Sequence, residues 1–134
     1  MQSTIQRSPT TLTRIGQVIS GLTALFLLFD AVIHVLKIQV VVDSFEKLGF
    51  PQGAAVGIGV LELICLALYV YRPTSVLGAI LLTGYLGGAV SAQLRIEAPL
   101  FSTLLFPVYT GVLVWAGLYL RDDKLRTLVP IHAR

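Results

Sequence analysis

Two long stretches of this chain contain no charged residue. Residues 73–94 and residues 98–120 contain no Asp, Glu, Lys or Arg. The hydrocarbon core of a bilayer is about 30 Å thick and a helix needs about 20 residues to cross it, so both stretches are long enough to span a membrane. Across the whole chain 55% of the residues are hydrophobic and 13% are charged, about half the charged fraction usual in soluble domains. The sequence therefore predicts an integral membrane protein.

Four apolar segments are separated by short polar stretches. They run over residues 15–36, 54–71, 75–94 and 101–120. We expect helices, because an open strand would leave main-chain groups unpaired in lipid. The strands of a membrane barrel alternate in polarity, and these continuous apolar runs do not. The predicted fold class is therefore all-α, an integral membrane four-helix bundle.

The basic residues are unevenly distributed between the two sides of the predicted bundle. Seven lie on one side, namely Arg7, Arg14, Arg72, Arg121, Lys124, Arg126 and Arg134, and three lie on the other, namely Lys37, Lys47 and Arg95. Under the positive-inside rule the side with seven faces the cytoplasm. We therefore expect a multi-pass protein of a bacterial inner or plasma membrane with both termini in the cytoplasm. Its parts are a polar N-terminal segment (1–13), a four-helix domain (14–120) and a charged C-terminal tail (121–134).

Several classes of function are disfavoured. The net charge of +3 does not indicate nucleic-acid binding, because the basic residues are scattered at segment ends. Cys65 is the only cysteine, which excludes an internal disulfide and a cysteine-based metal site. The chain also lacks a nucleophile elbow, a phosphate-binding loop and an HExxH motif. No complete catalytic motif is present, so we expect a protein without turnover of its own and predict no cofactor.

Three ionisable residues lie inside the predicted spans, Asp30, His34 and Glu62. A charge at the centre of a bilayer costs about 2.5–3.5 kcal/mol on insertion scales, so such residues are usually paired, solvated or functional. Asp30 and His34 are four residues apart and are therefore neighbours on one helix face. At 1.5 Å per residue, Asp30 lies roughly 5 Å and His34 roughly 11 Å to the outer side of the midplane, and Glu62 lies near the midplane.

Further polar residues of the third segment lie at compatible depths. Tyr85 is near the midplane, Gln93 is in the outer half and Arg95 ends that helix. Two interpretations stay open: these residues form interhelical hydrogen bonds that only fix packing, or they line a polar cavity that binds a ligand head group or relays protons. The usual functional role of intramembrane ionisable residues favours the cavity. We predict no metal site, because His132, the only other histidine, lies in the opposite tail.

Small residues recur every four positions in the third segment. Gly84, Gly88 and Ala92 would form a smooth face on which another helix can approach closely. We expect this face to pack within the bundle. A contact between two copies in a homodimer is the alternative.

Several short phrases occur in a characteristic order along the chain. They are Asp30 with His34, residues 45–51 (FEKLGFP), 59–63 (GVLEL) and 83–89 (TGYLGGA), and Trp115 shortly before residues 120–122 (LRD). In this order, over residues 14–128, they resemble the DoxX-like family of small four-helix membrane proteins. The resemblance implies a four-helix membrane bundle. Some relatives are described as small subunits of quinone-reducing oxidoreductases and others as accessory or assembly factors. Relatives often carry a histidine late in the third helix, where this chain has Gln93, which cannot titrate.

Three functions are compatible with these observations. The first is a binding or accessory membrane protein with a polar site in the outer half of the bundle, whose partners are membrane lipids and either a partner subunit or a second copy. The second, implied by the resemblance, is a small membrane subunit of a quinone-linked oxidoreductase, with quinone as the cofactor. The third is a proton-coupled small-molecule transporter, which the clear orientation bias disfavours.

Overall fold

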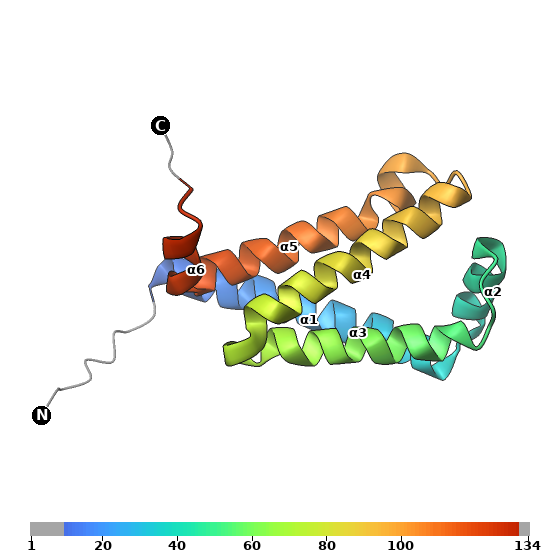
Figure 1. Cartoon of the computed structure of the whole chain (residues 1–134), viewed down its shortest axis with the longest axis horizontal. Coiled ribbons are helices and arrows are strands. Elements are labelled where there is room, and N and C mark those ends of the chain that lie inside the picture. Colours follow the sequence, from blue (N-terminus) through green and yellow to red (C-terminus); the bar gives the residue numbers. More distant parts are fainter. Residues whose placement is uncertain (1–9, 132–134) are drawn as a thin grey trace, which may run out of the picture.

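The computed structural model describes residues 10–131, and this part of the chain is almost entirely helical (Figure 1). The elements in chain order are α1 (Thr11–Leu36), α2 (Gln39–Leu48), α3 (Ala54–Val70), the 3₁₀ turn η1 (Arg72–Thr74), α4 (Ser75–Arg95), the π-helical turn η2 (Leu100–Leu104), α5 (Phe106–Arg121) and α6 (Asp123–Leu128). No strand occurs among the described residues, so the predicted all-α class is confirmed. Arg7, His132, Arg134 and most of the predicted segment 1–13 lie outside them.

Three helical stretches are long and apolar enough to cross a membrane. They are Thr11–Leu36, Arg72–Arg95 and Leu100–Arg121, which correspond to the first, third and fourth predicted spans. The second predicted span corresponds to α3, which is apolar but has 17 residues. At 1.5 Å per residue α3 is about 26 Å long, slightly shorter than a bilayer core.

Local sequence signals explain where the helices begin and end. The Thr10 hydroxyl accepts a hydrogen bond from the main-chain N–H of Thr13 at 3.3 Å and caps the start of α1. Helix α2 ends at Gly49, whose φ of 73° is in the left-handed region that glycine adopts without strain. Pro107 lies in the first turn of α5, where its missing N–H removes no helical hydrogen bond. The Asp122 carboxylate accepts a hydrogen bond from the main-chain N–H of Leu125 at 3.0 Å and caps the start of the short α6.

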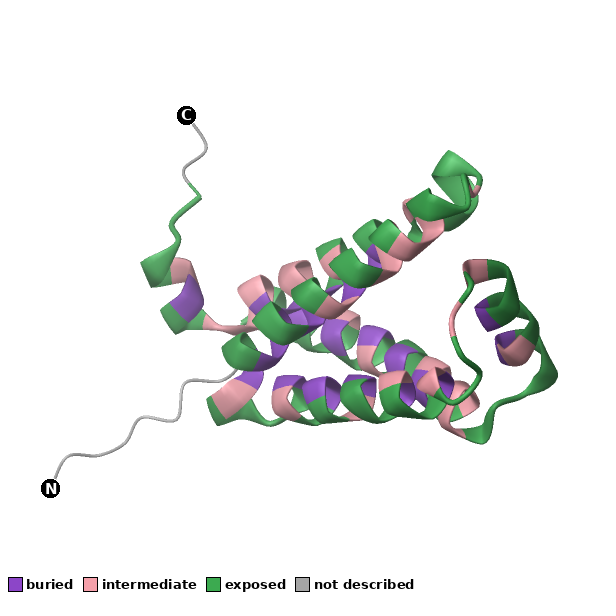
Figure 2. Cartoon of the chain, turned by 45° about the vertical axis from the view of Figure 1, so that its right-hand side comes forward, coloured by how far each residue is buried: buried purple, intermediate pink, exposed green. Residues whose placement is uncertain are grey.

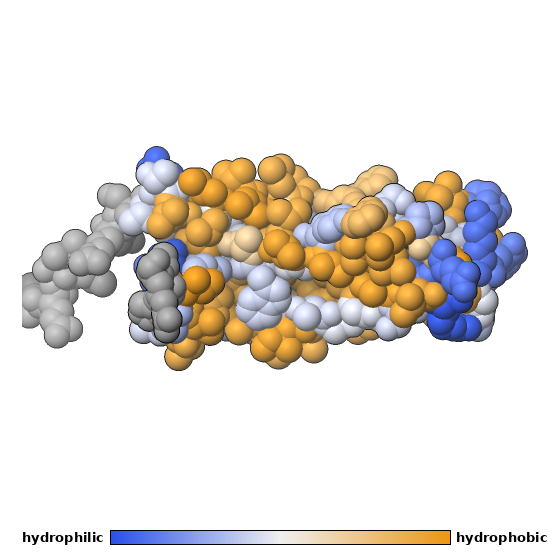
Figure 3. Space-filling model, turned by 90° about the horizontal axis from the view of Figure 1, so that it is seen from above, coloured by the Kyte–Doolittle hydropathy of each residue, from blue (hydrophilic) through white to orange (hydrophobic). Residues whose placement is uncertain are grey.

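Helices α1, α3, α4 and α5 pack around a common interior. Helix α1 contacts α3 and α5, and α4 contacts the same two helices. The buried residues lie on the sides that face one another (Figure 2). On α1 they form one stripe with spacings of three and four: Gly16, Ser20, Thr23, Leu27 and Ala31. The outer surface of the long body is largely hydrophobic, whereas the end formed by α2 is hydrophilic (Figure 3). This distribution is typical of a membrane protein, because lipid solvates the exposed apolar side chains.

Isolated glycines allow the helices to approach closely. A Cβ at Gly78 of α4 would lie 2.2 Å from the main-chain nitrogen of Tyr69 on α3. A Cβ at Gly117 of α5 would lie 2.4 Å from the Ser20 Oγ on α1. At Gly59 of α3 it would lie 2.9 Å from main-chain and side-chain atoms of α1. These three positions therefore fix the helix contacts α3–α4, α1–α5 and α1–α3, as small residues do in membrane bundles.

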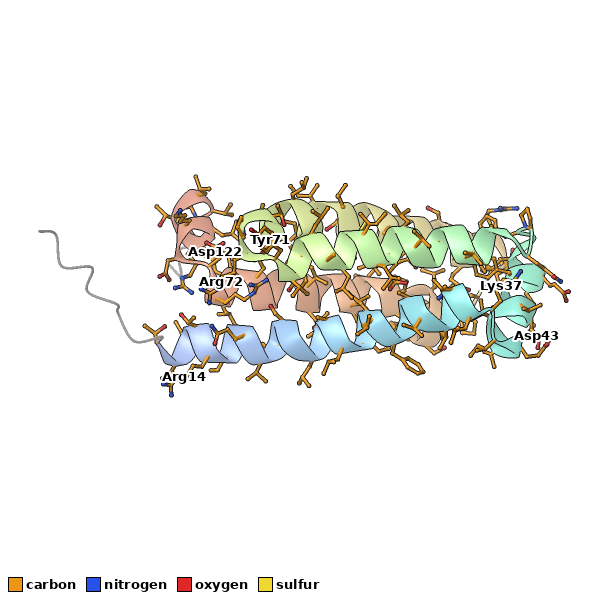
Figure 4. All side chains as sticks on the ribbon, turned by 90° about the horizontal axis from the view of Figure 1, so that it is seen from below. Arg14, Lys37, Asp43, Tyr71, Arg72 and Asp122 are labelled. Carbon is orange, nitrogen blue, oxygen red and sulfur yellow. The ribbon has the colours of Figure 1, made fainter. Side chains whose placement is uncertain are left out.

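Charged residues gather at the two ends of the body. Figure 4 shows Arg14, Arg72 and Asp122 at one end and Lys37 and Asp43 at the other. Helix α1 begins, and α6 lies, at the first end (Figure 1). The start of α1 and the whole of α6 thus lie at the same end of the molecule. Towards the other end, the pair α4–α5 diverges from the pair α1–α3 (Figures 1 and 2).

Candidate functional site

A cavity of about 640 Å³ lies where the two helix pairs diverge. Its volume is within the range of about 300–1,000 Å³ that is usual for small-molecule sites. Its polar lining comes from Asp30, His34, Glu62, Tyr85, Gln93, Ser102, Thr103 and Thr110. Its apolar lining comes from Phe26, Leu27, Phe45, Leu48, Phe50, Ile58, Leu61, Leu86, Ala89, Phe106 and Pro107, with Gly84, Gly88 and Ala92 of α4. No Lys or Arg among the described residues lines it, so its ionisable side chains, Tyr85 apart, are those of Asp30, His34 and Glu62.

The three ionisable residues of the spans meet in this cavity. One carboxylate oxygen of Asp30, one of Glu62 and one ring nitrogen of His34 all lie within 4.8 Å of one another. Helix α1 presents Asp30 and His34 on one face because they are four residues apart. Helix α3 presents Glu62 to them because Gly59, one turn earlier, allows α3 to touch the His34 Cβ. The close helix contact at Gly59 therefore assembles the cluster.

The His34 ring is held in one orientation. Its Nδ1 lies 2.7 Å from the main-chain oxygen of Asp30, and because that oxygen can only accept, Nδ1 donates. The same nitrogen lies 3.4 Å from the Asp30 carboxylate Oδ2. Phe45 of α2 contacts the ring edge-on, with the ring centroids 5.7 Å apart. The segment of residues 39–48, which connects two predicted spans, thus forms a helix whose buried side covers the site.

Glu62 is the most deeply buried member of the cluster, with 0% of its surface exposed. Its Oε2 accepts a hydrogen bond from the Tyr85 hydroxyl at 3.0 Å. Its Oε1 is buried and has no hydrogen-bond partner among the described residues. A buried polar atom without a partner costs about 1–3 kcal/mol. Oε1 is therefore a buried acceptor without a donor among the described residues.

The structure brings Gln93 to the cavity and leaves Arg95 out of it. Gln93 belongs to the lining, whereas Arg95 is exposed and does not line the cavity. Gln93 and Arg95 are two positions apart, and two positions correspond to about 200° of rotation around a helix. Their side chains therefore point to nearly opposite sides of α4. The prediction that Arg95 joins the cluster is wrong, because Arg95 lies at a compatible depth but on another face of α4.

The small residues of α4 line the cavity and do not pack against another helix of this chain. A Cβ added at Gly84 or Gly88 would meet nothing within 4 Å, and both residues border the cavity together with Ala92. The prediction that this face packs within the bundle is therefore wrong. The physical reason is the divergence of the helix pairs, which starts beyond the close contact at Gly78. Contact with a second copy stays a prediction.

A second polar cluster, which the sequence analysis did not single out, lies at the opposite end. The Arg121 Nε donates to the Ser20 hydroxyl at 3.0 Å, which lies 2.9 Å from the Tyr69 hydroxyl. The Tyr69 hydroxyl donates in turn to the main-chain oxygen of Val114 at 2.8 Å. The Arg121 guanidinium also lies 5.2 Å from the centroid of the Tyr69 ring. No buried polar side-chain atom of this cluster lacks a partner among the described residues, so we assign the cluster to helix packing.

A groove of about 730 Å³ lies between α4 and α5. Apart from Thr83 and a few aromatic polar atoms its lining is apolar, and it includes Gly87. The Trp115 Nε1 donates to the Thr83 hydroxyl at 2.7 Å. Because it holds no ionisable cluster, this groove resembles a surface for lipid chains more than a specific site.

Comparison with models of protein families identifies the family of this chain. A model of the DoxX-like family matches residues 18–117, a range that contains every residue of the cavity. The chain belongs to the DoxX-like family. Together with its apolar helices, this membership identifies the DoxX-like chain as a membrane protein. No match was found among curated proteins or among solved structures.

Proposed function

We propose that this DoxX-like protein is a membrane binding or accessory protein that holds an amphipathic small molecule in its cavity. One observation carries the proposal: Asp30, His34 and Glu62 converge on a cavity of about 640 Å³ that is otherwise largely apolar. A few convergent polar groups in an apolar pocket are the usual pattern of a ligand site. In this proposal the protein needs no turnover of its own.

The lining indicates the character of the ligand. Its apolar part would contact aromatic rings such as Phe26 and Phe106, whose centroids are 5.5 Å apart in an edge-to-face arrangement. Its head group would donate hydrogen bonds or carry positive charge, because two carboxyl groups face it and no Lys or Arg among the described residues lines the cavity. Such a head group would also satisfy the free Oε1 of Glu62.

A quinone is the second candidate ligand, which would make the protein a small subunit of a quinone-linked oxidoreductase. The specific observation in its favour is the presence of neutral donors in the lining, namely the Gln93 amide and the hydroxyls of Ser102 and Thr103. These groups can donate hydrogen bonds to quinone carbonyl oxygens. Electron transfer would then require a partner subunit that carries the redox cofactor. Recovery of the chain from gentle extraction with neither quinone nor a partner would contradict this candidate.

We propose that α3 is a fourth span and that both termini face the cytoplasm of a bacterial inner membrane. Helix α3 is packed between α1 and α4, and neighbouring helices and local thinning can accommodate a slightly short span. The cytoplasmic assignment rests on the distribution of basic residues. Single cysteines introduced by Asp43→Cys and Asp123→Cys in a Cys65→Ala background test it. An impermeant maleimide applied to intact spheroplasts should label the first and not the second; the reverse pattern would contradict the proposal.

Native mass spectrometry of gently extracted protein tests ligand binding. Gly88→Leu places a side chain in the cavity, whereas Gly87→Leu places one in the α4–α5 groove; a Cβ at either position meets no atom within 4 Å. We expect an organic adduct on the wild type and on Gly87→Leu, and its loss from Gly88→Leu. An adduct that persists in Gly88→Leu would contradict binding in the cavity, as would a wild-type chain without any adduct.

A further inference from the structure

We propose that Asp30, His34 and Glu62 form a binding site for one divalent transition-metal ion, such as Zn²⁺ or Mn²⁺. One ring nitrogen of His34 and one carboxylate oxygen each of Asp30 and Glu62 lie within 4.8 Å of one another on α1 and α3. Carboxylate oxygen and imidazole nitrogen are the donors that these ions accept in proteins. The separation of Asp30 and Glu62 in the sequence conceals this set from any motif search.

Glu62 provides an observation independent of the clustering. Its side chain is fully buried, yet Oε1 has no partner among the residues described. Burial without a partner is unfavourable for a carboxylate oxygen, and a bound cation would remove that penalty. The other oxygen, Oε2, is fixed by the Tyr85 hydroxyl at 3.0 Å. A hydrogen bond to the second oxygen of a carboxylate ligand is a common way to orient it towards a metal.

His34 is oriented as metal-binding histidines are. Its Nδ1 donates to the main-chain oxygen of Asp30 at 2.7 Å, and histidine ligands usually donate one ring N–H to a carbonyl or carboxylate. In the neutral ring the other nitrogen keeps a lone pair for a ligand. The edge-on contact with Phe45 further restricts the ring. Because the His34 ring is already held in place, binding of the ion would restrict its rotation little further.

The charges of two carboxylates and one divalent ion balance. Two carboxyl groups approach one another in the cavity, and no Lys or Arg lines it in the part of the chain that the structure describes. A divalent ion would neutralise both carboxylates, whereas uncompensated buried charge is strongly unfavourable. Three protein ligands also leave at least one coordination position open, as in metal sites that exchange ligands. That position would be available to water or to another group with a free lone pair.

Isothermal titration calorimetry with ZnCl₂ and MnCl₂ tests the site. The sample is the tag-free full chain in detergent, from which a chelator has first removed any bound metal. We expect saturable binding of one ion per chain. Glu62→Gln and Asp30→Asn should each weaken it by at least about 100-fold, because replacing a carboxylate ligand by a neutral amide should cost more than the loss of an outer-shell partner, which costs about 10–100-fold. Asp43→Asn, which changes an exposed carboxylate of α2, should leave the affinity unchanged. Absorption bands of bound Co²⁺ in the wild type, absent from His34→Gln, would report coordination directly.

Several outcomes would overturn the metal site. They are the absence of saturable binding, an affinity in both Glu62→Gln and Asp30→Asn equal to that of the wild type, and Co²⁺ bands that persist in His34→Gln. The proposal is separable from the binding of an amphipathic ligand. Gly88→Leu fills the apolar part of the cavity and should still bind the ion, whereas it should lose the organic adduct. Metal binding without an adduct, or an adduct without metal, would therefore contradict only one of the two proposals.

Discussion

Alanine at Gly78 should destabilise the protein, whereas alanine at Gly88 should not. The Cβ at Gly78 would lie 2.2 Å from the main-chain nitrogen and 2.5 Å from the Cα of Tyr69. Favourable contacts begin at about 3.5 Å, so α4 would have to move away from α3 by about 1 Å. Such overpacking usually costs about 1–3 kcal/mol. At Gly88 the Cβ would meet nothing within 4 Å.

The two substitutions share their effect on helix propensity, which favours alanine over glycine by up to about 1 kcal/mol. Their difference in unfolding free energy should therefore equal the overpacking term, about 1–3 kcal/mol in favour of Gly88→Ala. Reversible unfolding in mixed micelles with increasing SDS, followed by circular dichroism, measures this difference. Equal destabilisation by both substitutions would refute the reasoning, because it would mean that another helix packs on the Gly88 face.

Two further substitutions test contacts outside the cavity. Tyr69→Phe removes the hydroxyl that donates to the main-chain oxygen of Val114 at 2.8 Å. It should lower the unfolding free energy in the same assay by about 1–3 kcal/mol. An unchanged stability would show that this chain of hydrogen bonds does not hold α3 to α5. Thr83→Val removes the acceptor of the Trp115 Nε1, bonded at 2.7 Å. The emission maximum of this single tryptophan should shift to shorter wavelength, and an unchanged spectrum would contradict the bond.

The helices could be predicted from sequence because hydrocarbon imposes a simple rule. Runs without charge must be helical where they cross lipid, and the predicted boundaries at residues 36, 54 and 75 coincide with those of α1, α3 and α4. The meeting of Asp30, His34 and Glu62 was also accessible, since depth follows from counting residues at a fixed rise. Depth alone could not exclude Arg95, because the rotation of α4 about its axis also decides which side chains reach the site.

Helix contacts could not be predicted reliably from a short motif. The spacing of Gly84 and Gly88 is typical of a packing face, yet these residues border a cavity. Among the glycines that bring helices together, Gly78 and Gly117 have no other glycine or alanine four positions away, whereas Gly59 has Ala55. Which glycine lies at a crossing point depends on where the helix axes converge, and that is a property of the whole bundle. Tyr69 is similar, because only the fold shows that its hydroxyl is enclosed by α1 and α5.

The central claim is that Asp30, His34 and Glu62 act together as one ligand site. Native mass spectrometry of gently extracted protein tests this claim most directly. The variants to compare with the wild type are Asp30→Asn, His34→Gln and Glu62→Gln, and the control is Arg95→Gln. We predict that each of the three substitutions removes the same organic adduct, and that Arg95→Gln retains it. Retention of the adduct by all three variants, or its equal loss from Arg95→Gln, would contradict the claim.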